Sequence, residues 1–402
     1  MSNMKRSNGI SPLAKAAALG VALATLALGQ QASAGPTERA QARRMYDRLT
    51  GTPPEEGLLT LLENKIVSDG LEETAWFIIN PAQDHSKNFY TVTLKNFAAP
   101  WTNRDQSIFA PLNDYTATVI GLIKDDADFR QVLFDDVVYV GTDTSIPAYS
   151  PTSNEHYAKL ESNSVDLRTL RRTMQSSLNG LPSEATAGVI TSRAGAEAFF
   201  LDGTNRAMFR FTLLNHLCRD LEQVHDTTRP TDRIRQDVTR SPGGDSSVFN
   251  NNCVGCHSVM DSMAQAFAFY DFDETAKRLV YTPEQVQPKY LINADNFRPG
   301  FVTPNDAWDN RMRLDGRNDV RVLGWDPSLP GSGKGAKSLG RELAYSGAFA
   351  QCQAEKAFRK VCFRSPTTVA EYNRVKAIGD EFKSGHSMRR VFAQVAAECA
   401  GN

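Results

Sequence analysis

The feature that most constrains this chain is a C-x-x-C-H pentapeptide, in which Cys253 and Cys256 are followed directly by His257. Two residues between the cysteines place both sulfurs on one side of a helical turn. This spacing is the attachment signature of c-type haem, in which the two sulfurs bond the haem vinyl groups and the histidine becomes the proximal iron ligand. The sequence therefore predicts one covalently attached haem c, held by Cys253 and Cys256 and ligated by His257.

Three other uses of such a cysteine pair fit the sequence less well. A zinc site needs a second Cys/His pair at similar spacing, and Cys352 and Cys362 lie ten residues apart. A thioredoxin-like redox pair belongs near a βαβ unit, whereas the segment before the motif, residues 241–252, is rich in Gly, Ser and Asn and predicts a loop. A structural disulfide between cysteines this close is strained.

Residues 1–34 have the pattern of an export signal. A basic start is followed by a 14-residue apolar stretch at 16–29 and by an A-x-A cleavage signal at 32–34. The apolar stretch is too short to span a bilayer comfortably, so an uncleaved membrane helix is the weaker alternative. We therefore expect a mature protein that starts at Gly35 and resides in the periplasm, outside the cell or at its surface.

Composition narrows the choice of partners. The 402 residues are 41% hydrophobic and 23% charged, which is typical of a globular protein. Lys and Arg together number 45 against 46 Asp and Glu, and no run of five like charges occurs, which argues against a nucleic-acid partner. Because no stretch beyond the signal approaches 18 apolar residues, we expect no transmembrane anchor after cleavage.

The mature chain predicts a mainly α-helical fold in two parts: a helical N-terminal domain at 35–200, and a haem c-binding domain with C-terminal helices at 201–402. Residues 331–338 resemble a phosphate-binding loop but do not meet the G-x-x-x-x-G-K-[ST] spacing, so they predict a flexible connection. Helix-forming patterns predict helices at 36–49, 57–79, 208–221, 338–362, 367–383 and 387–399, and two helices followed by an extended end within 113–140.

The four cysteines outside the motif predict two disulfides, since an exported protein keeps few free thiols. Cys352 and Cys362 share one predicted helix and are separated by about 15 Å along its axis, which is too far for a bridge. If the last three helices run up, down and up, Cys399 lies at the level of Cys362. This geometry favours Cys362–Cys399 and leaves Cys218 to pair with Cys352.

The run at 253–274, CVGCHSVMDSMAQAFAFYDFDE, resembles the haem-binding segment of the planctomycete-type cytochrome c domain family. In that family the motif is followed by an acidic residue, a turn of small residues and an aromatic stretch ending in F-D, here Asp261, 264–266 and 267–273; the usual D-P-x-G is absent. Weaker likeness extends to 43–54, 217–219 and 346–359. The resemblance implies an exported, mostly helical haem protein with a cytochrome c-like haem domain.

A single C-x-x-C-H leaves two functional classes open. If a second protein ligand fills the distal iron position, the protein transfers single electrons between redox partner proteins; if that position is open, it is a mono-haem enzyme or binds gases or peroxide. Met312 is the preferred distal ligand because it follows His257 by 55 residues, as in small class I cytochromes. A partly exposed loop residue is the competing interpretation of Met312. His386 and Met388 are the next candidates.

Overall fold

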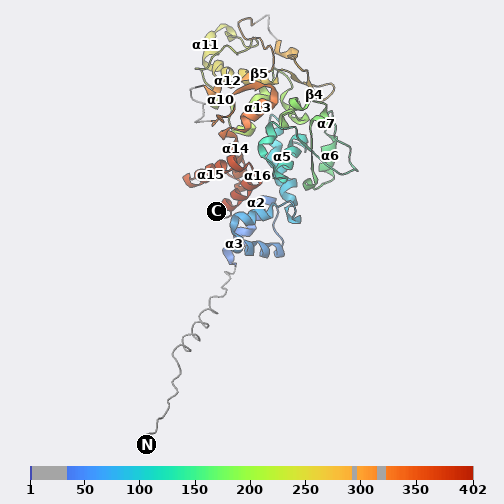
Figure 1. The fold of residues 1–402 in the computed structure, drawn as a ribbon, viewed down its shortest axis with the longest axis vertical. Helices are drawn as coiled ribbons and strands as arrows, with labels where there is room; N and C mark the ends of the chain where they lie inside the picture. Colours follow the sequence, from blue (N-terminus) through green and yellow to red (C-terminus); the bar gives the residue numbers. More distant parts are fainter. Residues whose placement is uncertain (2–33, 292–296, 315–322, 402) are drawn as a thin grey trace.

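The computed structural model describes residue 1 and residues 34–291, 297–314 and 323–401, so the predicted export signal lies almost entirely outside the described residues. The described chain is mainly helical, as the sequence predicts (Figure 1). Its α-helices are α2 Pro36–Thr50, α3 Glu56–Ile78, α4 Leu94–Ala98, α5 Asp114–Lys124, α6 Glu155–Ser162, α7 Ser176–Asn179, α8 Arg193–Phe199, α9 Arg206–Thr212, α10 Leu221–Val224, α11 Ser246–Val248, α12 Val254–Ala264, α13 Gly335–Ala344, α14 Gly347–Cys362, α15 Val369–Gly385 and α16 Met388–Ala400.

Short antiparallel strand pairs supplement the helices. They are β1 Val138–Val140 with β2 Arg171–Thr173, β3 Tyr270–Asp273 with β4 Arg278–Tyr281, and β5 Ala307–Asp309 with β6 Ser332–Lys334. The extended end predicted at 137–140 is therefore confirmed as β1. The stretch at 331–338 is not a flexible connection, because β6 pairs with β5 and leads directly into α13.

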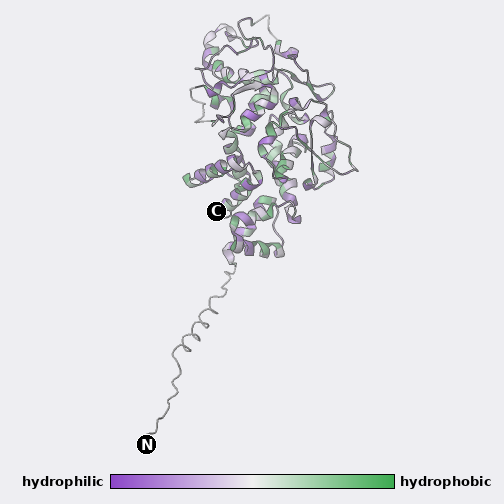
Figure 2. Ribbon diagram, in the orientation of Figure 1, coloured by the Kyte–Doolittle hydropathy of each residue, from purple (hydrophilic) through white to green (hydrophobic). Residues whose placement is uncertain are grey.

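One buried hydrophobic core runs from Ala42 in α2 to Ala400 in α16. The last helix, α16, packs against α2 and α3, so the two ends of the described chain lie together (Figure 1). Many helices carry both apolar and polar residues (Figure 2), and helices such as α14 and α16 bury their apolar face. The predicted domain boundary near residue 200 falls in a buried stretch, where Phe200 packs on Phe267 and Tyr270; the division into domains stays a prediction.

Three predicted helices are interrupted for local reasons. The helix at 57–79 is bent at Gly70, whose φ of 83° is accessible to glycine at little cost. The helix at 208–221 ends earlier, at the left-handed residue Cys218. The helix at 338–362 is two helices, since the Ser346 hydroxyl accepts a hydrogen bond from the Phe349 amide at 3.1 Å and starts α14 afresh.

Both predicted disulfides are present. The Cα atoms of Cys218 and Cys352 are 5.2 Å apart, and those of Cys362 and Cys399 are 5.7 Å apart. Cys362 ends α14 and Cys399 lies at the end of α16, so these two helices run in the same direction with α15 packed against both. The up, down and up arrangement expected from the sequence is therefore confirmed.

We predict that replacing both Cys362 and Cys399 with alanine lowers the free energy of unfolding by about 3–4 kcal/mol, because the bridge closes a long loop and restricts the unfolded chain. Urea unfolding of the oxidised protein measures the loss. An unchanged unfolding free energy, or a non-reducing peptide map that joins Cys352 to Cys399, would contradict the arrangement.

Candidate haem attachment site

The C-x-x-C-H motif lies within a helical run from Ser246 to Ala264, where α11, a π-helical turn at Phe249–Cys253 and α12 follow one another. The run begins because the Asp245 carboxylate accepts a hydrogen bond from the Ser247 amide at 2.8 Å and caps the first turn. The prediction of a loop for 241–252 is thus wrong for most of that segment, because this aspartate cap outweighs the low helix propensity of its Ser and Asn residues. No strand precedes the motif within residues 241–252, however.

The two motif cysteines are free thiols, each partly exposed. They lie one helical turn apart, so both point to one side of the helix. Burial raises the pKa of the Cys256 thiol, and nearby Glu222 adds to the effect. A thiol–disulfide enzyme needs the opposite, a thiol whose pKa is lowered so that the thiolate forms. The environment of Cys256 therefore lacks the lowered thiol pKa that is typical of a redox-active pair.

The other side of the motif is covered by the chain that follows α10. The Gly255 carbonyl accepts from the Asp226 amide at 3.0 Å, and the Ser258 hydroxyl donates to the Asp226 carbonyl at 2.9 Å. A Cβ atom at Gly255 would lie only 3.2 Å from the side chains of His225 and Thr227. Glycine between the cysteines therefore allows the helix to approach this segment closely.

His257 is held by a carboxylate one turn further along α12. Its Nδ1 lies 3.1 Å and 3.2 Å from the two oxygens of Asp261. Since Asp261 is ionised, Nδ1 carries the proton and donates it to this hydrogen bond. In the neutral imidazole the lone pair is then on Nε2, and Nε2 makes no hydrogen bond in the part of the chain described. This is the arrangement in which a second partner fixes the orientation of a metal-binding histidine.

Asp261 is in turn held by a buried ion-pair network. Arg206 at the start of α9 donates from Nε at 2.7 Å and from Nη2 at 2.9 Å to the two Asp261 oxygens. The same guanidinium contacts Asp237 at 2.6 Å and 2.9 Å. Burial alone would raise the pKa of the Asp261 carboxyl, but the charge of Arg206 holds it well below its usual value. Asp261 is thereby kept as a hydrogen-bond acceptor.

Met312 lies in a short 3-10 helix, Arg311–Arg313, that packs against α12. Its side chain is 1% exposed, so the interpretation of Met312 as a partly exposed residue is wrong. The segment is fixed because the Asn310 side chain accepts from the Met312 amide and donates to Glu342, which also pairs with Arg313. The predicted distal ligand, Met312, therefore lies in a segment that packs against α12, the helix that carries the predicted proximal ligand His257.

The other candidate ligands have structural roles. His386 adopts a left-handed conformation after the last residue of α15, and Met388 is buried at the start of α16. Met260 and Met263 are buried on α12 itself, the helix that carries His257.

Two features of the site were not predicted from the sequence. The family resemblance points to Asp261 as an acidic residue, but its contact with His257 was not predicted. A local signal for that contact existed, because residues four apart on a helix are neighbours. Arg206 and Asp237 carry no local signal, because they reach α12 only through the fold.

The residues fit a covalently attached haem. Free thiols on one side of a helix and a histidine with an unused Nε2 are the groups that c-type attachment requires. Within the described ranges, no three His, Cys, Asp or Glu side chains gather to hold a bare metal ion. A haem iron needs only one or two protein ligands, since the porphyrin supplies the others.

No family model, curated protein or solved structure matches this chain. The resemblance of 253–274 to the planctomycete-type cytochrome c domain therefore stays a prediction.

We predict that Arg206→Met lowers the free energy of unfolding by about 3–5 kcal/mol, because it leaves Asp261 and Asp237 buried without their shared cation. Arg210→Met, one turn along the same helix, is the matched control: its ion pair with Asp220 is half-exposed and contributes less than ~1 kcal/mol. Denaturant unfolding of both variants measures the difference, and equal losses would contradict the buried role of Arg206.

Proposed function

We propose that this protein is an exported mono-haem c-type cytochrome that carries single electrons between redox partner proteins. The observation that carries the proposal is the state of the three motif residues. Cys253 and Cys256 are free, partly exposed thiols. The His257 ring is oriented by the hydrogen bond from Nδ1 to Asp261, which leaves Nε2 available to bind a metal. When bound, the haem would supply an iron that cycles between the ferric and ferrous states.

The chain's own residues orient and tune the proximal ligand. Asp261 accepts a hydrogen bond from the Nδ1–H group of His257. This bond fixes the orientation of the ring and makes Nε2 a stronger electron donor to a metal. Arg206 binds both Asp261 oxygens, so its positive charge offsets the negative charge of the buried carboxylate. Because Asp237 holds Arg206 from the other side, the histidine is anchored to α9 as well as to its own helix.

Export is part of the proposal, and its support is indirect. The two disulfides, Cys218–Cys352 and Cys362–Cys399, suit an oxidising compartment. No helix in the described part combines the length and apolar character needed to cross a bilayer. The proposed location is the periplasm, the cell surface or the surrounding medium, and the proposed partners are redox proteins.

A mono-haem protein with an open iron position is the second candidate. The hydrogen bond from His257 to a carboxylate favours it, since a strong proximal donor supports ligand binding opposite. The buried position of Met312 beside α12 favours electron transfer instead. The coordination state of the iron separates the two.

We predict that protein exported from a host with c-type haem attachment machinery retains its colour after acid–acetone extraction, because thioether bonds survive it. Cys253→Ser with Cys256→Ser should lose the haem under the same treatment. Cys218→Ser with Cys352→Ser is the control and should keep it, since that pair forms a disulfide. Colour loss from the unaltered protein would refute the proposal.

We predict a thioether-to-iron charge-transfer band in the oxidised protein and its loss in Met312→Ala, because Met312 is the proposed distal ligand. Met388→Ala removes a methionine that is equally buried, at 1% exposed, and should retain the band. A high-spin spectrum that shifts readily with carbon monoxide or cyanide would instead support the open-iron candidate.

We predict that Asp261→Asn raises the haem midpoint potential by tens of millivolts. The neutral amide is a weaker acceptor, so the histidine donates less and the ferric form loses stabilisation. Asp237→Asn is the matched control, because it contacts the same guanidinium but not His257, and its shift should be smaller. Equal shifts, measured by redox titration, would show that the effect comes from the removed charge beside Arg206 and not from the hydrogen bond to His257.

A further inference from the structure

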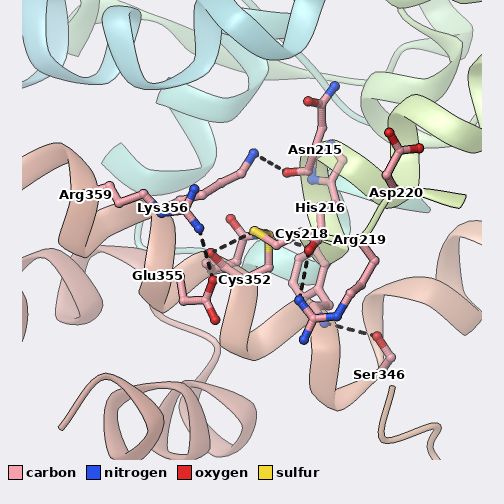
Figure 3. Close-up of a disulfide and its surroundings, with 12 residues drawn as sticks. Asn215, His216, Cys218, Arg219, Asp220, Ser346, Cys352, Glu355, Lys356 and Arg359 are labelled. Carbon is pink, nitrogen blue, oxygen red and sulfur yellow. Dashed lines mark hydrogen bonds and ion pairs between the residues drawn. A yellow bond between two sulfur atoms is a disulfide. The ribbon is translucent and has the colours of Figure 1, made fainter. Parts of the chain in front are cut away.

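A cleft separate from the haem motif is lined by cations from one side of α14. Its volume is about 640 Å³, which lies in the range of small-molecule sites. Lys356, Arg359 and Lys360 contribute the charges, and their spacing of three and four residues places them on one face of the helix. Figure 3 shows Lys356 and Arg359 projecting from α14 beside the Cys218–Cys352 disulfide.

Two of these cations lack an acidic partner. Arg359 pairs with Glu355 at 3.1 Å, but no carboxylate in the described part of the chain lies within ion-pair distance of Lys356 or Lys360. Asp220, the acidic residue in the cleft wall, is already engaged by Arg210 at 2.6 Å. The cleft therefore has an uncompensated positive charge.

The Lys356 ammonium is held away from water on apolar surroundings. Its Nζ donates to the Asn215 carbonyl at 2.5 Å (Figure 3). The same Nζ lies 4.1 Å from the centre of the Trp101 ring. Burial, together with the neighbouring Arg359, lowers the pKa of Lys356 well below its usual value. A carboxylate bound beside this lysine would favour its charged form and would gain an ion pair in return.

Apolar side chains form another part of the cleft wall. Trp101 and Leu214 line it, and Ile108 at the rim is 48% exposed. The adjoining Phe109 is 89% exposed, which is unusual for a large aromatic side chain. A hydrated inorganic anion would leave this wall unused, whereas a carboxylate on an apolar body would fill it and reach the cations.

We infer that this cleft binds a small organic carboxylate, with the carboxylate on Lys356 and Lys360 and the apolar body against Leu214 and Ile108. The cleft also adjoins the haem motif. Asp220 and Gln223 line it from either side of Leu221, whose carbonyl lies 3.7 Å from the Cys256 sulfur. A bound anion would therefore lie close to the proposed haem.

Isothermal titration calorimetry of the full exported protein tests the binding site. Phenylbutyrate should bind saturably and more weakly as salt is added, while neutral phenylbutanol and inorganic phosphate should bind at least tenfold more weakly. Absence of saturable phenylbutyrate binding would overturn the inference, as would phosphate or phenylbutanol binding equally well.

Variants locate the site. Lys356→Gln should weaken phenylbutyrate binding at least tenfold, and Lys360→Gln should weaken it several-fold. Lys376→Gln is the control, since this lysine on α15 is exposed and pairs with Asp380, and it should leave binding unchanged. Circular dichroism verifies the folding of each variant; because Lys360 makes no ion pair in the described chain, its variant tests the site even if Lys356→Gln unfolds. Unchanged binding in folded Lys360→Gln protein would overturn the inference.

A second measurement, which depends on the proposed function, tests the position of the cleft. Saturating phenylbutyrate should lower the haem midpoint potential, because a nearby negative charge favours the ferric iron. Calorimetric binding by a protein without haem would support the cleft and refute the cytochrome. A haem protein that binds no phenylbutyrate would support the cytochrome and refute the cleft.

Discussion

The hydrogen bond between His257 Nδ1 and Asp261 is the interaction on which the proposed site depends. It decides which nitrogen of the imidazole is free, and it does so only because Asp261 stays ionised while fully buried. Arg206 makes this possible by binding both carboxylate oxygens, and Asp237 shares the same guanidinium. The proposed proximal ligand on α12 is thus oriented by an ion pair that begins on α9, so the geometry of the proposed site depends on how those two helices pack.

The disulfide Cys218–Cys352 connects this site to the C-terminal helices. Cys218 ends the π-helical turn after α9 in a left-handed conformation, and the chain then forms α10, whose Leu221 carbonyl contacts the Cys256 sulfur. On the other side of the disulfide, Lys356 of α14 lines the proposed carboxylate-binding cleft. The Cys218–Cys352 disulfide therefore fixes the segment that lies between the cleft and the C-x-x-C-H motif, so the C-terminal helices contribute to both proposed sites.

The sequence predicts those features that depend on local pattern or on chain geometry. The spacing of the cysteines along the last helices predicts both disulfides, and residues 36–49 predict α2. The C-x-x-C-H spacing also leads to the proposed attachment site, which stays a prediction. The wrong predictions come from single residues that act locally. Asp245 caps a helix where Gly, Ser and Asn predict a loop, and Ser346 divides one predicted helix into two. Arg206 could not be found, because the partner that gives it a function lies 55 positions away. The burial of Met312 likewise depends on Glu342, which holds its neighbours from α13.

The central claim is that Cys253, Cys256 and His257 hold one haem, and the intact mass of the exported protein tests it most directly. Mass spectrometry under denaturing conditions should give the polypeptide from Gly35 onward plus one haem, and fragmentation should place that added mass on the peptide containing residues 253–257. A polypeptide mass without haem, from cells that attach haem to other c-type proteins, would contradict the account.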